Sequence, residues 1–262
     1  MSVVLAIDVG NSFNKVGLFQ IEAANSLPTC LRSRSVRADQ PFPWSEIASW
    51  SEWCGSSSVI ATTNPSHKTN LLAAWPGNYS SPHEITSPTE IGLPIDLLEP
   101  QRVGIDRVLN ALAANRIRVP HCPVIIVDSG TATTVDVVTK DGVFVGGAIL
   151  PGFELAARSL HRYTALLPLI PIDELHESEP APIGNETRSA LRSGLFWGQI
   201  GAVRELVSRV NQSLGMPPES EATLILTGGG SELLRPYFPD AMHAPHLALQ
   251  GLALAALQNP SR

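Results

Sequence analysis

The chain has 262 residues, of which 44% are hydrophobic and 16% charged, and its formal net charge is −6 at pH 7. This length exceeds that of most single domains and predicts two domains of about 110–150 residues each. No apolar segment is long enough to span a bilayer, and the 18 basic residues are scattered along an acidic chain. We therefore expect a soluble globular protein that binds neither membrane nor nucleic acid.

The cysteines and the first residues indicate the compartment. Cys30, Cys54 and Cys122 are odd in number and lack CxxC spacing, which favours free thiols in a reducing compartment. The beginning of the chain, MSVVLAIDVG, has no basic leader and reads as a strand, so we expect a cytoplasmic protein without a signal peptide. His243 and His246 lie in a proline-containing loop without cysteines, and we expect no metal cluster there.

The segment Val3 to Phe19 predicts a strand, a turn and a second strand. An apolar run ends at Asp8, the turn Gly10-Asn11-Ser12 follows, and a second apolar run begins after Lys15. We expect residues 3–9 and 15–20 to pair antiparallel, because glycine and asparagine tolerate the positive φ angles of a tight turn. Such a turn exposes its backbone amides.

The next segment contains little apolar periodicity. Residues 22–58 predict loops with one short helix around Ser45–Trp53 and no chemistry. A strand is expected at Val59–Thr62 and a helix at Ser66–Trp75 with Ser66 as its N-cap. Thr86–Gln101 is rich in proline and glycine and predicts a surface loop.

Gly104 to Arg107 opens a run of helix-forming residues, VLNALAANR. Asp106 lies in the first turn, where a carboxylate is stabilised by the helix dipole, so simple capping is one interpretation. Arg107 weighs against it, because a cation at a helix N-terminus is unfavourable. Asn110 lies on the same helix face as Asp106. Capping and function both remain open.

Pro120–Pro123 predicts a domain boundary, and the segment Val124 to Asp136 that follows predicts a second hairpin. Its corner, Asp128-Ser129-Gly130, offers oxygen acceptors for a cation and backbone N–H donors for a phosphate. A hairpin that merely needs a tight turn is the alternative. The corner nevertheless repeats the pattern at Asp8.

The second half continues the alternation of strands and helices. We expect a strand at Val143–Leu150, a helix at Phe153–Arg162, a loop at 163–184, a helix at Asn185–Leu214, a strand at Thr223–Thr227 before the Gly228–Ser231 corner, and a helix at Leu247–Leu257. These predict two α/β layers with mixed sheets and a ligand between similar halves. Neither GxxxxGK[ST] nor a GxGxxG after a strand occurs, so P-loop and Rossmann folds lose their usual support.

Taken in their order and spacing, the motifs resemble those of the type III pantothenate kinases. They run from residue 3 to about residue 254 and comprise Asp8-Val-Gly-Asn-Ser with Lys15, Gly104-Ile-Asp-Arg107, Asp128-Ser-Gly-Thr-Ala132, Gly146-Gly-Ala-Ile-Leu-Pro-Gly152, Thr164-Ala165-Leu-Leu-Pro168, Gly184-Asn-Glu-Thr187 and Leu226-Thr-Gly-Gly229.

The resemblance implies two ribonuclease-H-like domains of the actin-like ATPase superfamily, residues 1–120 and 121–262, with nucleotide in the cleft between them. It implies transfer of the ATP γ-phosphoryl group to pantothenate, which gives 4′-phosphopantothenate and begins coenzyme A synthesis. It also implies a homodimer with the pantothenate pocket at its interface.

The resemblance also assigns site residues. Asp106 matches the proton acceptor, Arg107 the group that holds the substrate carboxylate, and Thr187 a pocket residue. The substrate set is Gly104, Ile105, Asp106, Arg107 and Thr187. The ATP set is Asp8, Val9, Gly10, Asn11, Ser12, Phe13, Asn14, Lys15 and Thr131. Asp128 matches the ligand of a monovalent cation, K⁺ or NH₄⁺, and Mg²⁺ is expected with the triphosphate.

One position departs from the family pattern. Family members commonly carry a pantothenate-contacting tyrosine nine residues before the catalytic aspartate, where this chain has Leu97. Two alternatives therefore stay open: a non-catalytic accessory or regulatory relative of the same fold, and a kinase for another small acid or sugar.

Overall fold

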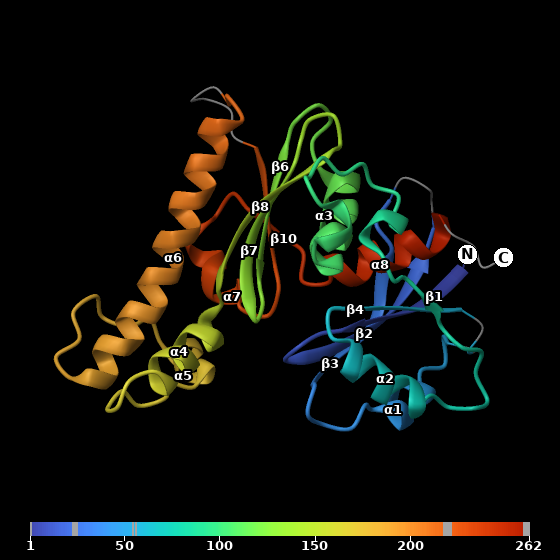
Figure 1. Cartoon of the computed structure of the whole chain (residues 1–262), viewed down its shortest axis with the longest axis horizontal. Coiled ribbons are helices and arrows are strands. Elements are labelled where there is room, and N and C mark those ends of the chain that lie inside the picture. Colours follow the sequence, from blue (N-terminus) through green and yellow to red (C-terminus); the bar gives the residue numbers. More distant parts are fainter. Residues whose placement is uncertain (1, 23–25, 54, 56, 217–221, 259–262) are drawn as a thin grey trace. The chain divides into compact units, whose positions relative to one another are not determined.

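The computed structural model describes residues 2–22, 26–53, 55, 57–216 and 222–258, which belong to two compact units (Figure 1). Unit 1 comprises Met1–Pro120, Val138–Val145 and His246–Arg262, and unit 2 comprises His121–Val137 and Gly146–Pro245. The first change of unit falls between Pro120 and His121, where the sequence predicts a boundary, and residues 138–145 and 246–262 also belong to unit 1. Residues 138–145 belong to unit 1 because Phe144 is hydrogen-bonded to Pro94 and Asp96. The segment that begins at residue 246 belongs to it because its helix packs on the sheet and on another helix of unit 1.

Unit 1 is built on a five-stranded sheet of order β3-β2-β1-β4-β5. Its strands are β1 (Ser2–Val9), β2 (Phe13–Ile21), β3 (Thr29–Arg37), β4 (Ser58–Thr62) and β5 (His83–Glu84). The pairs β1/β2 and β2/β3 are antiparallel, whereas β1/β4 and β4/β5 are parallel. The mixed sheet and the pairing of residues 3–9 with 15–20 are therefore confirmed.

The strand β3 lies where the sequence predicted loops. None of its residues is fully buried, and Arg32, Arg34 and Arg37 recur along it. It is an edge strand, and charged side chains protect such an edge from pairing with other chains. The apolar alternation that identifies a half-buried strand is consequently absent.

Helices cover both faces of this sheet. On one face α8 (Leu247–Gln258) packs on β1, β2 and β4 and on α3 (Ile105–Ile117). A Cβ added at Gly251 would overlap the carbonyl group of Leu109 in α3, so the two helix backbones meet at a position that requires glycine.

The other face carries an apolar cluster of unit 1. Leu5, Ile7 and Val9 alternate along β1 and therefore point to one side, where they meet Ile47 of α1 (Trp44–Ala48) and Leu71 of α2 (Pro65–Ala73). The short helix expected in residues 45–53 is confirmed as α1, which ends earlier.

The N-cap of α2 is Asn64, and the prediction of Ser66 was wrong. Asn64 Oδ1 accepts a hydrogen bond from His67 N at 3.2 Å, and Pro65 occupies the first helical position, where its missing N–H costs nothing.

Unit 2 repeats the strand order of unit 1. Read as β8-β7-β6-β9-β10, its sheet runs third, second, first, fourth and fifth strand, as in unit 1. The strands are β6 (Val124–Ser129), β7 (Ala132–Val138), β8 (Phe144–Pro151), β9 (Thr223–Thr227) and β10 (Met242–His243). Residues 130–131 join β6 to β7 in a hairpin, and β9 is parallel to β6 and to β10. The predicted similarity of the two halves is confirmed.

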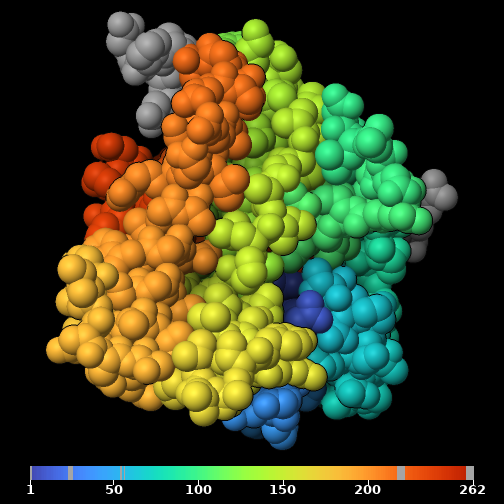
Figure 2. Space-filling view, turned by 60° about the vertical axis from the view of Figure 1, so that its left-hand side comes forward, coloured from blue at the N-terminus to red at the C-terminus, as the bar shows by residue number. Residues whose placement is uncertain are grey.

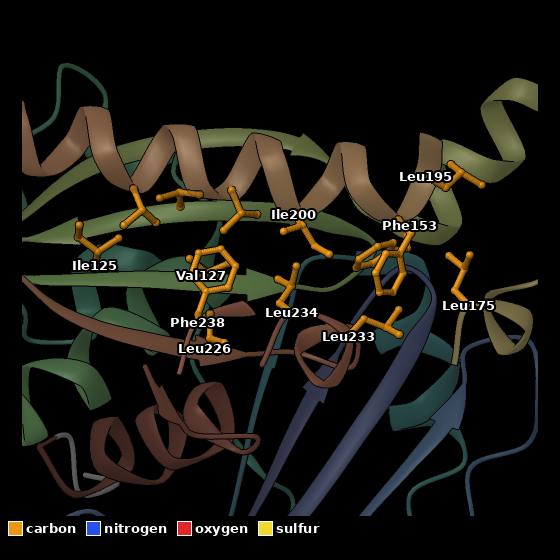
Figure 3. Close-up of a cluster of buried hydrophobic side chains, with 14 of the residues drawn as sticks. Ile125, Val127, Phe153, Leu175, Leu195, Ile200, Leu226, Leu233, Leu234 and Phe238 are labelled. Carbon is orange, nitrogen blue, oxygen red and sulfur yellow. The ribbon is translucent and has the colours of Figure 1, made fainter. Parts of the chain in front are cut away.

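The core of unit 2 lies between its sheet and the long helix α6 (Thr187–Ser213). Figure 3 shows Ile125 and Val127 of β6 below this helix, from which Ile200 enters the cluster. Phe153 of α4 (Phe153–Arg162) and Leu234 of α7 (Ser231–Leu234) complete it. The predicted helices at 153–162 and 185–214 are confirmed. The sequence also predicts that Pro217 and Pro218 end the second of these helices, and they lie outside the described residues.

The proline-rich stretch 163–184 is not only a loop, because it contains α5 (Ile172–Glu177), whose N-cap is Pro171. A six-residue helix between prolines gives too short a periodic pattern to be recognised. The remaining elements are the short 3₁₀ helices η1 (Pro88–Glu90), η2 (Pro100–Arg102) and η3 (Arg235–Tyr237).

Candidate active site

The turn between β1 and β2 carries most of the predicted ATP residues. Asp8 and Lys15 stand directly opposite each other on the two strands, and Asp8 is buried, so the lysine charge offsets the cost of burying the carboxylate. Gly10 N donates to Phe13 O at 3.1 Å, and a Cβ added at Gly10 would lie 2.6 Å from that oxygen. The turn is therefore tight and requires glycine.

Asn14, the second residue of β2, is buried, and its Oδ1 atom has no hydrogen-bond partner among the residues that the structure describes. An orphaned buried acceptor is uncommon and calls for a donor from outside the chain. This observation fits a polar ligand at the turn.

Asp106 and Arg107 open α3, as predicted. Asp106 Oδ1 accepts a hydrogen bond from Arg107 N at 2.9 Å, so the carboxylate does satisfy one of the free amides of the first helical turn. A Cβ added at the N-cap Gly104 would lie 2.6 Å from the same oxygen. Both side chains stay partly exposed, whereas Asn110 on the next turn is buried. The cap therefore leaves the Asp106 carboxylate accessible.

The guanidinium group of Arg107 lies over the ring of Phe144, 5.8 Å from its centroid. Phe144 is fully buried, and the segment that precedes Leu97 is tied to it. Asp96 N donates to Phe144 O and Phe144 N donates to Pro94 O, both at 2.9 Å. Leu97, the position that departs from the family pattern, thus directly follows a segment that is hydrogen-bonded to Phe144, the residue beneath Arg107. Sequence reasoning missed Phe144 because no local signal links it to Arg107.

In unit 2, Asp128 is the last residue but one of β6 and lies beside the glycine corner after β9. Gly228 has φ +85°, and a Cβ there would overlap Asp128 Oδ1. Ser129 is buried, and within the described part of the chain its Oγ atom has no hydrogen-bond partner. A carboxylate beside an orphaned hydroxyl is a set of hard oxygen donors, which fits an alkali-metal cation.

The two predicted threonines occupy exposed positions of unit 2. Thr131 lies in the β6–β7 turn, and its carbonyl accepts a hydrogen bond from Gly152 N at 3.1 Å. Thr187 is the first residue of α6, after the N-cap Glu186, which accepts from Ser189 N at 3.0 Å. The predicted site residues thus fall into a unit 1 group and a unit 2 group.

Among the described residues, no group of three or more His, Cys, Asp or Glu side chains could hold a metal ion, and no helix is long and apolar enough to cross a membrane. Burial raises the pKa of the Cys30 thiol above its ordinary value. Cys54 lies outside the described part of the chain.

Two mixed sheets of one strand order, each with an aspartate at the end of its first strand, define a protein of the actin-like ATPase and sugar kinase fold class. Solved structures agree. A Campylobacter jejuni protein assigned to the Baf family of transcriptional activators has a TM-score of 0.60 at 20% identity over 98% of both chains. A Sinorhizobium meliloti protein assigned as a 2-dehydro-3-deoxygalactonokinase has a TM-score of 0.53 at 13% identity, covering 99% of this chain and 100% of its own.

The chain belongs to the type III pantothenate kinase family, whose model matches residues 4–209. A type III pantothenate kinase from Thermomicrobium roseum is 33% identical over 97% of this chain and 96% of its own length. Another from Acidiphilium cryptum is 40% identical over 65% of this chain, a match that spans 60% of that relative. The resemblance found in the motifs is confirmed.

Proposed function

We propose that this chain transfers the γ-phosphoryl group of ATP to the primary hydroxyl of pantothenate, giving 4′-phosphopantothenate for coenzyme A synthesis. The observation that carries this proposal is the family match over residues 4–209, which contains every predicted catalytic, substrate and ATP residue. The accessible Asp106 carboxylate beside Arg107 supports it.

Asp106 accepts the proton of the attacking hydroxyl. Phosphoryl transfer passes through a loose transition state, so positioning and charge stabilisation dominate, and the base acts late. A carboxylate oxygen can accept this proton when it lies within hydrogen-bond reach of the hydroxyl. Arg107 holds the carboxylate of pantothenate, because its planar fork can bond both oxygens at once. Gly104, Ile105 and Thr187 line the substrate pocket.

The β1–β2 turn, with Lys15, and Thr131 bind the phosphates of ATP. Bound Mg²⁺ would supply charge neutralisation of the triphosphate, and K⁺ or NH₄⁺ held by Asp128 with Ser129 would offset the carboxylates near it. Because the reaction draws on the ATP pool of the cell interior, the cytoplasm is the proposed location.

The decisive assay is acceptor-dependent ADP release by the purified chain. ADP release should require pantothenate and should fall when Na⁺ replaces K⁺. Release with another small acid or sugar, and not with pantothenate, would identify a kinase of different specificity. A chain that releases ADP with no member of an acceptor panel would be the accessory relative.

We also propose a homodimer formed through α4 and α6 of unit 2, which Figure 2 shows in yellow and orange. Leu155, Leu160, Tyr163 and Leu166 are exposed on α4 and the residues after it, more apolar surface than a monomer usually leaves in water. On α6, exposed small residues recur at Ala190, Gly194, Gly198 and Gly201. Such a stripe lets a second helix approach closely.

Replacing Gly198 by leucine tests this dimer. We expect the dimer dissociation constant to rise about tenfold or more, because the added side chain stands where a helix backbone packs. Sedimentation velocity at several concentrations measures it. Gly77→Leu, at a glycine with open space around it, is the control. A wild-type chain that is monomeric and fully active would contradict the proposal.

Phe144→Leu tests the support of Arg107. We expect KM for pantothenate to rise about two- to tenfold, because the variant loses the free energy of a partly desolvated cation–π contact. KM for ATP should stay unchanged. Phe19→Leu, at another fully buried phenylalanine of unit 1, is the control for packing loss. Equal effects of the two substitutions on KM for pantothenate would remove Phe144 from this role.

A further inference from the structure

The backbone carbonyls of the β1–β2 turn are held by the β4–α2 connection. Thr62 Oγ1 and Thr63 N donate to Val9 O at 3.0 Å and 3.1 Å. His67, one turn into α2, lies with Nδ1 3.1 Å from Gly10 O. Because a carbonyl oxygen can only accept, Nδ1 carries the hydrogen in this contact.

This contact fixes the direction of the next amide. The peptide unit is planar and trans, so the carbonyl of Gly10 and the N–H of Asn11 point in opposite directions. While His67 holds the carbonyl, the Asn11 N–H is directed away from α2. A flip of this peptide would present a carbonyl oxygen in place of an N–H donor and would repel a phosphate.

The side-chain amide of Asn64 contacts both α2 and the β1–β2 turn. Its Oδ1 atom accepts from His67 N and caps α2, whereas its Nδ2 atom donates to Asn11 Oδ1 at 3.1 Å. Its own N–H donates to Thr62 Oγ1 at 2.8 Å. An ordinary N-cap needs only the first of these contacts. The side chain of Asn64 therefore joins the start of α2 to the turn.

We propose that Asn64 and His67 are positioning residues for ATP: they hold the Gly10–Ser12 turn with its amide donors directed toward the phosphates. The proposal rests on the assignment of this turn to ATP. It extends that assignment to two residues at the start of α2, which act through their hydrogen bonds to the turn.

His67 permits a matched pair of substitutions. Asparagine places an N–H donor at the δ position, where Nδ1 lies, whereas leucine keeps a similar bulk without a donor. We expect His67→Leu to raise KM for ATP about three- to tenfold, the loss of one hydrogen bond, with kcat and KM for pantothenate nearly unchanged. His67→Asn should restore most of the affinity for ATP.

Asn64→Ser separates the cap from the turn. Serine caps a helix as well as asparagine but is too short to reach Asn11. We expect an unchanged melting temperature and a KM for ATP raised about three- to tenfold. A melting temperature that falls while KM for ATP stays at the wild-type value would show a merely structural role and overturn the inference.

Asn11→Ala, within the turn, separates this inference from the function on which it rests. If Asn11→Ala raises KM for ATP but His67→Leu and Asn64→Ser do not, the positioning role fails and the ATP assignment stands. If none of the three changes KM for ATP, the turn does not bind ATP and both fail.

Discussion

Replacing Asp106 by asparagine is expected to lower kcat for pantothenate phosphorylation by about 10²- to 10⁴-fold, the contribution of a general base. Asparagine keeps the shape of the side chain and an oxygen that can accept from Arg107 N, so the first turn of α3 should remain intact. It cannot take the hydroxyl proton. Pantothenate-dependent ADP release under single-turnover conditions measures the chemical step.

The control for this substitution is the binding of both ligands. Because the asparagine variant retains Arg107 and the turn at Asp8, titration calorimetry should give dissociation constants for ATP and pantothenate close to those of the wild type. Full turnover by the variant would remove Asp106 from its role, and loss of binding would show that its carboxylate holds the substrate instead.

Replacing Gly228 by alanine is expected to destabilise the protein by about 2–4 kcal/mol. The residue has φ +85°, and the new Cβ would overlap Asp128 Oδ1 and lie 2.6 Å from Ser129 O. Ser129 O is a backbone atom and Asp128 belongs to strand β6, so neither neighbour can move without a large cost in free energy. Urea denaturation followed by far-UV circular dichroism measures the loss.

Gly229→Ala is the matched control, because no atom lies within 4 Å of its added Cβ. It should change the free energy of unfolding by less than about 0.5 kcal/mol. If the Asp128 carboxylate holds K⁺, Gly228→Ala should also weaken the dependence of ADP release on K⁺. Equal stability of the two variants would contradict the packing argument.

Apolar runs and turn residues were enough to predict the mixed sheets. β1, β6 and β9 are buried on both faces and therefore read as continuous apolar segments, and the glycine corners after them mark their ends. β3 was not predicted because it is a charged edge strand, and β10 was not predicted because it is two residues long. The helix α5 was not predicted because it is short and lies in a proline-rich segment.

The candidate site was predictable only where its chemistry lies in contiguous motifs. Asp106 with Arg107, and Asp128 with Ser129, are neighbours in sequence, so their spacing could be read directly. Phe144 and His67 reach the site through tertiary pairing, which leaves no local pattern. Asn64 did carry a signal, since asparagine followed by proline is typical of a helix start.

The packing of α8 on α3 has a consequence for how the molecule acquires its activity. Residues 247–258 supply the surface against which the helix of Asp106 is held, and glycine at 251 makes that fit close. During synthesis on the ribosome, residues 105–117 emerge well before residues 247–258, so this helical layer of unit 1 cannot close until α8 has been made. The Asp106 carboxylate therefore takes up its final position only after α8 has emerged and packed on α3.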